Sequence, residues 1–507
     1  MKKFLAVILT GLLCVATVFG TIACGGGSNS GAVRFIVYTG GGSLDDSYRI
    51  QKKVNDYVLE KLGFEVELEY VGYNSYVETV GRYFGANEPF DMCYMGSQVS
   101  GLTYSERASA GYLKDLTDLL PEYAPDLYNS MSADVWEAAK VDGKIYGGIN
   151  EQIFARSVGI GIRTDVAEAI GMTQEKIDAE NITWQDAIRM AMTYIKNDPI
   201  LSPNGIVPST ALVLGHDMWE CIVMQANCLD ALGAAAYWPG VIAPDSNTVI
   251  NQYESEYYKQ LADFCRECWE NGWIDKRQED APVTTNQMVR SCGTYYPDVA
   301  ENDLYTSIGS EFEVFRFSQP FLTTTSVTTT MTCVSVASNK TEKCLQLMNL
   351  IYKDQYLYNL LAIGEEDLEY KWVKGYDEND EEYQYISYIK ESKYKPFADW
   401  AVGSQLNVYR KRGYAEDWVQ VIKDINKNAT KSSAYGFSYV PSSNDVTSAL
   451  STANNIASRY TSQFINGQYD KNKTNEEIIA ELNKDLAPYL NKIIQDKQTQ
   501  LDAFLGK

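Results

Sequence analysis

Aromatic side chains are the most prominent source of binding chemistry in this chain. Its 507 residues include 37 tyrosines and 9 tryptophans. Both side chains combine a flat apolar face with a polar group, so they can stack on a sugar ring and hydrogen-bond its hydroxyls. This composition suits a carbohydrate site but does not locate one, because many of these rings must belong to the core or the surface.

Motifs of common catalytic chemistries are absent from the sequence. It contains no G-x-S-x-G, no H-E-x-x-H and no catalytic Cys–His signature, and its only histidine, His216, is interpreted as structural. The 67 acidic residues nevertheless leave open a carboxylate pair for glycoside hydrolysis, since only their separation in space matters. A surface glycoside hydrolase therefore remains the enzymatic alternative.

Three local patterns suggest a cofactor, phosphate or metal, and each has a simpler interpretation. Cys265 and Cys268 form a C-x-x-C inside a predicted helix, without further metal ligands, so they are interpreted as buried thiols. The glycine run 40–42 lacks the remainder of a phosphate-binding motif. The segment 470–474 lacks the glycine of a calcium loop, and Thr474 with Glu477 instead predicts a helix cap. We expect no cofactor and no metal.

The elements that must position a site begin with a β/α alternation. The strands contain β-branched and aromatic residues, and the helices show apolar residues at a helical period. The pattern predicts strand, helix, strand, helix and strand over residues 33–38, 45–62, 64–71, 75–84 and 90–95. This order is typical of a parallel sheet covered by helices.

The remainder of the chain is predicted to be richer in helices. Residues 165–273 are expected to be mostly helical, 323–337 extended, and 344–363 a single apolar helix that begins near Asn339 and Glu342. An acidic loop at 377–382 precedes a final helical region, whose last helix Pro488 is expected to kink. Strong acidity, with a formal net charge of −23, argues against nucleic acid as a partner.

The first residues have the pattern of an export signal. Lys2 and Lys3 precede an apolar run that is too short for a comfortable membrane span, which predicts a signal peptide over residues 1–23. The sequence 21–24 resembles a lipobox, with Thr21 where leucine is usual, and this implies lipidation of Cys24. Residues 24–32 then form the lipidated end and a flexible tether. The alternative is ordinary cleavage near Gly20.

Four segments in order resemble the extracellular solute-binding proteins of bacterial ABC importers, family 1, of the carbohydrate type and Gram-positive lipoprotein branch. The segments are EPFDM at 88–92, AGYLKDLTDLL at 110–120, WEAAKVDGKIYG at 136–147 and the helix region 338–361. The resemblance covers nearly the whole mature chain. It implies an α/β, two-lobed fold of type II, with a mainly parallel, helix-flanked sheet in each lobe and a largely helical C-terminal extension.

The resemblance also implies a division of the chain and a mode of action. Lobe 1 is expected to comprise residues 33–150 and 283–330, and lobe 2 residues 151–282 and 331–507. The implied function is capture of an oligosaccharide between the lobes, at the outer face of the cell membrane, and its delivery to the permease subunits of an ABC transporter. A lipid anchor is then the only membrane element, and the protein is expected to be monomeric and not an enzyme.

Candidate ligand contacts follow from the expected cleft. Loops beyond the carboxyl ends of the strands converge there. The predicted contacts are Tyr38, Gly41, Tyr73, Asn74, Ser97, Asn150, Glu151, Trp219, Trp238, Tyr295, Trp400 and Asn407. For Asn150 and Glu151 a solvated crossover loop is an equal alternative, and any tryptophan can instead belong to the core.

The ligand itself stays open at this point. A neutral oligosaccharide is expected first, because an acidic one has to overcome the net negative charge, although Arg156 or Arg163 can help it. A non-sugar solute such as a peptide is the alternative within the same class of protein. A structural lipoprotein is disfavoured because the sequence lacks repeats and low-complexity stalks.

Overall fold

The structure is a computed structural model. It describes residues 31–86, 88–96, 102–215, 218–233, 238–274, 284–376 and 382–507. The predicted signal peptide, Cys24, Ser97 and His216 lie outside these residues. The chain divides into Met1–Ala32 and a second compact unit, Val33–Lys507, which is described below. None of the helices in the described residues has the length and apolar character needed to cross a membrane.

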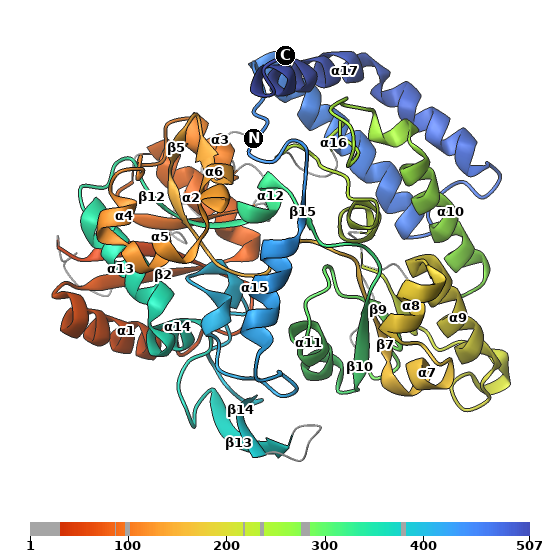
Figure 1. The fold of residues 1–507 in the computed structure, drawn as a ribbon, viewed down its shortest axis with the longest axis horizontal. Helices are drawn as coiled ribbons and strands as arrows, with labels where there is room; N and C mark the ends of the chain where they lie inside the picture. Colours follow the sequence, from red (N-terminus) through yellow and green to blue (C-terminus); the bar gives the residue numbers. More distant parts are fainter. Residues whose placement is uncertain are drawn as a thin grey trace, which may run out of the picture. The chain divides into compact units, whose positions relative to one another are not determined.

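The first sheet contains the predicted β/α alternation. Its strand order is β2 (Val66–Gly72), β1 (Val33–Thr39), β3 (Met92–Gly96), β12 (Thr330–Val334) and β6 (Gly147–Ile149). β1 pairs in parallel with β2 and β3, whereas β12 is antiparallel to β3 and β6. Helices α1 (Ser47–Leu62) and α2 (Tyr73–Ala86) connect the parallel strands (Figure 1). Residues 33–96 therefore fold as the sequence pattern predicts.

The second sheet is smaller and mostly antiparallel. Its order is β10 (Phe312–Arg316), β7 (Gly159–Arg163), β9 (Val289–Ser291) and β8 (Leu212–Val213). Only β8 and β9 pair in parallel. Both sheets are thus mixed rather than mainly parallel, while the expected class of helix-flanked α/β sheets is confirmed.

Strand pairing assigns three late strands differently from the predicted division of the chain. β9 and β10 fall in the range 283–330 expected in lobe 1, but they pair within the second sheet. β12 falls almost entirely in the range expected in lobe 2, but it pairs within the first. We therefore call the first sheet with its helices lobe 1 and the second sheet with its helices lobe 2. The repeated crossing of the chain has no local sequence signal.

Short elements occupy the stretch between the sheets of the two lobes. Helices α3 to α6 and the hairpin of β4 and β5 precede the first crossover. Their bounds are Tyr104–Ser109, Leu120–Tyr123, Pro125–Ser130, Ala133–Ala138, Lys140–Val141 and Lys144–Ile145. The turn between β4 and β5 contains Asp142 and Gly143, both with positive φ. Residues 140–145, within the segment WEAAKVDGKIYG, therefore form a β-hairpin.

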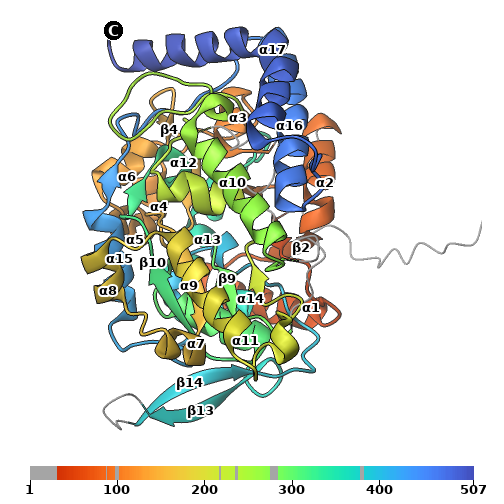
Figure 2. The ribbon, with the colours of Figure 1, turned by 90° about the vertical axis from the view of Figure 1, so that its right-hand side faces the viewer.

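The helices of lobe 2 follow its sheet strands and the C-terminal segment. They are α7 (Thr164–Ala169), α8 (Gln174–Glu180), α9 (Trp184–Asn197), the π-helix η2 (Trp219–Met224), α10 (Glu256–Glu270), α16 (Asn444–Ile465) and α17 (Asn475–Phe504). Figures 1 and 2 both show α16 beside α17 and close to α10. Thr474 and Glu477 form the predicted capping box, and α17 continues through Pro488. Cys265 and Cys268 are buried free thiols, as interpreted from the sequence.

Three sequence expectations between residues 323 and 363 are corrected by the structure. The threonine-rich segment is not wholly extended, because Thr323 caps a short helix, α12 (Thr324–Val327), before β12 begins. The single predicted helix is two helices, α13 (Thr341–Lys353) and α14 (Gln355–Ala362), separated at Asp354. Lys340 rather than Asn339 precedes α13, without a side-chain cap. Threonine hydroxyls favour such local caps over a continuous strand.

A third apolar core lies outside the two sheets' own cores. It contains residues from α11 (Val299–Ile308), α14, α15 (Trp418–Asn428) and the hairpin of β13 (Tyr370–Tyr376) and β14 (Glu382–Tyr388). Two further short strands, β11 (Phe321–Leu322) and β15 (Thr430–Lys431), pair in parallel. Residues after Tyr370 therefore contribute to every core of the unit and cannot be treated as an appended tail.

Candidate functional site

An aromatic cluster lies at the carboxyl-end edge of the first sheet. Tyr38 is the penultimate residue of β1, and Tyr94 lies in the neighbouring parallel strand β3; their two rings lie 4.8 Å apart. The ring of Trp400 lies 5.5 Å from Tyr38 and 5.9 Å from Tyr94. These spacings are typical of tilted and edge-on aromatic contacts. The structure thus unites two of the predicted contacts, Tyr38 and Trp400, with Tyr94, which sequence analysis did not select.

Exposed aromatic rings accompany this cluster. Tyr38 and Tyr94 are buried, Trp400 is half-buried, and Tyr73 at the start of α2 is 56% exposed. Burial raises the pKa of the Tyr38 phenol, and the neighbouring Tyr73 raises it further. Asn74, also exposed, follows Tyr73 in the same helix turn. Tyr73 and Asn74 are therefore exposed at this edge, and their contact with a ligand stays a prediction.

The glycine run after β1 is required by a backbone that passes close to it. A Cβ on Gly40 would collide with the carbonyl oxygen of Phe397, and one on Gly42 with that of Lys395. The Gly40 N–H donates to the Pro396 carbonyl at 2.7 Å. Only Gly41, with φ of 94°, is exposed and free of neighbours. Close packing explains glycine at positions 40 and 42, and the positive φ explains it at position 41; contact of Gly41 with a ligand stays a prediction.

Phe397 is a further aromatic residue at this loop that the sequence did not indicate. Its ring contacts the Gly42 position and is 66% exposed, and its backbone has a positive φ of 48°. A large residue rarely adopts this conformation, and such strain clusters at functional sites. The signal is tertiary, because nothing in residues 390–400 shows that they cross the loop after β1.

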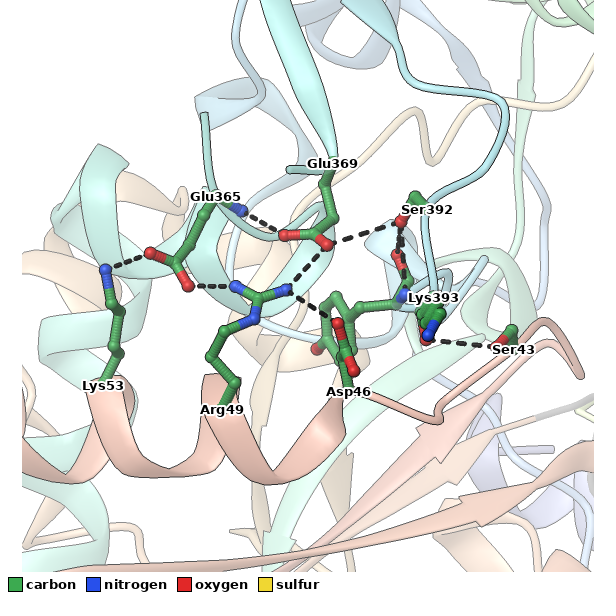
Figure 3. Close-up of polar contacts among 9 residues, drawn as sticks. Ser43, Asp46, Arg49, Lys53, Glu365, Glu369, Ser392 and Lys393 are labelled. Carbon is green, nitrogen blue, oxygen red and sulfur yellow. Dashed lines mark hydrogen bonds and ion pairs between the residues drawn. The ribbon is translucent and has the colours of Figure 1, made fainter. Parts of the chain in front are cut away.

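An ionic network anchors the segment that carries Phe397 and Trp400. Figure 3 shows Arg49 of α1 between Glu365 and Glu369, with Lys53 also paired to Glu365. Arg49 donates to Glu369 at 2.7 Å, and the Ser392 hydroxyl donates to the same carboxylate at 3.5 Å. Through these contacts Glu365 and Glu369 are held against α1 of lobe 1, and Ser392 is tied to Glu369. The contacts help to keep residues 395–397 beside the glycine run 40–42.

The predicted contacts after β6 are buried in the crossover rather than exposed. Asn150 is 2% exposed, donates to the Ala401 carbonyl at 2.9 Å and accepts from the Thr332 hydroxyl at 2.9 Å. Glu151 accepts from the Tyr352 phenol at 2.5 Å and from the Ser404 hydroxyl at 2.7 Å. Burial, followed by the charge of Glu151, raises the pKa of Tyr352. Both side chains are thus satisfied within the protein.

Asn407 belongs to the same crossover network. The side-chain amide of Asn407 donates to the backbone carbonyl of Tyr352. The backbone carbonyl of Asn407 accepts from the side-chain amide of Asn359 at 2.9 Å. Gln152, next to Glu151, donates to the Thr330 hydroxyl at 2.8 Å. These contacts join β6, β12, α13 and residues 401–407. The observed role of the network is to fix the crossing segments; its predicted contact with ligand stays a prediction.

Arg156 differs from these residues because its side chain has no partner. Its backbone pairs with Phe321, N–H to carbonyl at 2.8 Å, but its guanidinium forms no hydrogen bond or ion pair with any described residue. Burial lowers the pKa of Arg156, while Cys221 and Glu220 of η2 raise it, followed by Tyr296 and Tyr94. The guanidinium therefore lies near residues of the aromatic cluster and of η2 at once. Arg156 is half-buried, and its guanidinium offers five donors that no described residue uses.

The remaining predicted contacts lie in lobe 2. Trp219 is fully buried, and its ring lies 5.4 Å from that of Tyr258. In this structure Trp219 is therefore a core residue. Trp238 is half-buried and lies edge-on to Tyr439 at 6.5 Å. Tyr295 is half-buried, and its N–H donates to the Ser157 carbonyl at 2.7 Å, one residue from Arg156. Within the described residues no cluster of three or more His, Cys, Asp or Glu suited to a metal is found.

Comparisons with known proteins agree with this architecture. Residues 433–506 match a domain of unknown function, DUF3502. Across 510 residues the chain is 22% identical to a carbohydrate ABC transporter substrate-binding protein of Streptococcus pneumoniae serotype 4, with 97% of this chain and 96% of the relative covered.

Two solved structures define the class of fold. The N-glycan transport solute-binding protein NgtS of Streptococcus pneumoniae superposes with a TM-score of 0.75 at 19% identity, covering 94% of this chain and 99% of the other. An HMO-binding, ABC-transporter-associated solute-binding protein of Bifidobacterium longum infantis gives 0.55 at 13% identity, covering 94% and 99%. The chain therefore has the fold of the type II solute-binding proteins, and the predicted fold class is confirmed.

Proposed function

We propose that this protein is a lipid-anchored extracellular solute-binding protein that captures a neutral oligosaccharide between its lobes and delivers it to an ABC importer. The observation that carries the proposal is the unpartnered Arg156 guanidinium beside the Tyr38, Tyr94 and Trp400 cluster. Apolar ring faces with a few convergent polar groups are the usual composition of a small-molecule site.

The division of labour follows from the side chains. Trp400, with Tyr73 and Phe397 at the exposed edge, supplies surfaces on which sugar rings stack. Arg156 donates to adjacent hydroxyls through its planar fork, and removal of a sugar's water shell is offset by these charge-assisted bonds. Trp238 and Tyr295 are the proposed contributions from lobe 2. One arginine with an acidic environment suits a neutral ligand better than a polyanion.

The crossover network gives the proposed hinge its mechanical basis. Glu151, Asn150 and Asn407 hold the crossing segments through buried hydrogen bonds, so the lobes can rotate about a fixed axis while the site closes. A ligand that contacts both lobes favours the closed state by its extra contacts there. Transporter recognition of the closed form then couples capture to delivery. The predicted signal peptide and the predicted lipidation of Cys24 support a location at the outer membrane face, and no step requires turnover of the sugar.

The first test is a thermal-shift screen of residues 31–507 against neutral, acidic and peptide ligands. A ligand that binds only the folded state raises the melting temperature with concentration. We expect a shift with a neutral oligosaccharide that is recovered chemically intact. A shift with peptides alone contradicts the sugar assignment, and recovery of hydrolysed sugar favours the alternative of a glycoside hydrolase.

A matched pair of tryptophan variants localises the effect. Trp400→Ala is expected to lower affinity by about 10- to 100-fold, because aromatic stacking and the apolar contact area are lost. Trp372→Ala in β13, where the ring is 39% exposed, serves as the control and is expected to leave affinity unchanged. Equal effects in both variants contradict the proposed location.

A further inference from the structure

A large groove lies in lobe 2, apart from the aromatic cluster. Its volume is about 970 Å³, toward the upper end of the range of small-molecule sites. The end of α8, the start of α9, the residues after η2 and the segment 316–319 form its walls. Trp184 and Phe317 contribute aromatic carbon to the lining.

The charges along this groove are neutralised within the protein. Arg189 donates to both oxygens of Glu267 at 2.7 Å and to Asp186 at 2.8 Å. Arg316 pairs with Asp178 at 3.4 Å. No arginine of the lining is therefore left to bind an anion, and its two aspartates are not left to bind a cation. A charged ligand gains little here.

Side-chain amides are the groups that remain unused. Within the described part of the chain, Asn181, Gln185, Gln260 and Gln319 line the groove without any side-chain hydrogen bond to another residue. Each amide offers two donors and an acceptor. A sugar hydroxyl both donates and accepts, so a row of amides matches a neutral polyhydroxylated chain better than an apolar or ionic ligand.

The groove shares two chain segments with the Arg156 site. Gln319 lies two residues before Phe321, whose backbone pairs with Arg156 through two hydrogen bonds of 2.8 and 2.9 Å. Asn227 lies shortly after η2, and Cys221 and Glu220 of η2 raise the pKa of the Arg156 guanidinium. Segments that contact one site thus continue directly into the other.

We propose that the groove is a second carbohydrate subsite, which holds a branch or the distal end of a neutral oligosaccharide bound at Arg156 and Trp400. This proposal rests on the proposed function and adds a selection for ligand size to it. A disaccharide uses the central site alone, whereas a larger or branched sugar also uses the amides of the groove.

Calorimetric titration of residues 31–507 with a size series of neutral oligosaccharides tests the subsite. The series is linear and branched, from disaccharide to heptasaccharide, and includes Man1GlcNAc and Man5GlcNAc, the ligands in the NgtS complexes. The double variant Gln185→Ala/Gln319→Ala is expected to weaken binding of the larger sugars by about 10-fold, as two hydrogen bonds are lost. Affinity for the disaccharides is expected to change by less than about 2-fold.

Two further variants keep the result interpretable. Gln495→Ala, at an exposed glutamine of α17 outside the groove, is expected to bind every sugar as the unmodified protein does. Gln319→Trp fills the groove from an exposed loop position and should exclude the larger sugars without lowering the melting temperature. Undiminished binding of large sugars by both groove variants, or equal losses for small and large sugars, overturns the subsite alone. If no sugar in the series binds, the proposed function fails together with it.

Discussion

The crossover network and the Arg156 site both contain polar side chains, but the protein satisfies these side chains in the network and not at Arg156. Asn150 and Glu151 are buried with their polar groups bonded inside the protein. Arg156, six residues after Asn150, has a guanidinium without a partner among the described residues. A half-buried guanidinium without a protein partner can donate to a ligand, whereas the side chains of Asn150 and Glu151 are already used within the protein.

The largest effect is expected from Arg156→Met, which removes the free donors and keeps an apolar stem. Oligosaccharide affinity should fall by about 100-fold or more, since hydrogen bonds to a charged group are worth about 1.5–3 kcal/mol each. The melting temperature should stay nearly constant, because the half-buried guanidinium forms no hydrogen bond or ion pair with any described residue. Calorimetric titration and thermal unfolding measure the two quantities.

Arg163→Met is the matched control for Arg156. Arg163 ends β7 and pairs with the exposed Asp165 at 2.6 Å. Its loss should leave affinity unchanged. If Arg156→Met keeps full affinity, or loses it only together with folding, the comparison between satisfied and unsatisfied groups breaks down.

The next largest effect is expected on stability, from Glu151→Ala. This change leaves the Tyr352 and Ser404 hydroxyls without their shared acceptor in a buried place. Each unsatisfied group costs about 1–3 kcal/mol, so the free energy of unfolding should decrease by several kcal/mol. Urea unfolding measures it. Glu106→Ala, at a half-buried position in α3, should cost much less. Unchanged stability of the Glu151 variant would remove the hinge role.

Gly42→Ala sharpens the assignment of the glycine run to packing. The added Cβ meets the Lys395 backbone, which cannot yield without displacing the segment that carries Phe397. A loss of about 1–3 kcal/mol of stability is expected from such overpacking. Gly81→Ala in α2, where a Cβ meets nothing, should instead stabilise by about 0.5–1 kcal/mol. Thermal unfolding of the pair decides it, and a tolerated Gly42→Ala contradicts the packing account.

The last effect is on the pH dependence of stability and concerns the buried Lys497 of α17, which donates to the Gly240 carbonyl at 2.7 Å and the Ala231 carbonyl at 3.4 Å. Burial lowers the pKa of Lys497 from 10.5 to about 7, against the opposing charge of Asp230. Between these values the unfolded chain binds the extra proton, so stability should rise with pH, by up to about 1.4 kcal/mol per unit.

Lys497→Met should abolish this part of the pH dependence. The variant is expected to exceed the unmodified protein in stability most at pH 7 and below, with the difference shrinking toward pH 10. Urea unfolding at pH 6, 8 and 9 measures the slopes. Parallel slopes in the two proteins show that Lys497 is charged when folded.

The sequence predicts those parts of the molecule that local patterns determine. In residues 33–96 the spacing of apolar residues alternates between that of a strand and that of a helix, as the structure does. The capping box at Thr474 is likewise a local sequence feature. The pairing of β12 with β3 depends instead on contacts between residues over 200 positions apart. No local period encodes such pairing, which is why the predicted division of the lobes differs from the observed strand order.

The candidate site shows the same limit. Residue type and position select Tyr38 and Trp400 from the sequence, and the structure brings their rings to 5.5 Å; their contact with a ligand stays a prediction. Sequence patterns do not distinguish the core tryptophan Trp219 from the half-buried Trp400, because burial is a tertiary property. The strained Phe397 has no sequence signal either. Arg156 was identified only as an aid to acidic ligands, since the absence of a partner cannot be inferred from residue type.

The central claim is that a neutral sugar occupies the space between Arg156 and Trp400. The most direct measurement is a crystal structure of residues 31–507 with the sugar that gives the largest thermal shift. The account predicts a sugar ring within about 4 Å of the Trp400 ring and hydroxyls about 3 Å from the Arg156 guanidinium. A sugar bound elsewhere, with Arg156 paired to a carboxylate of the protein, would contradict it.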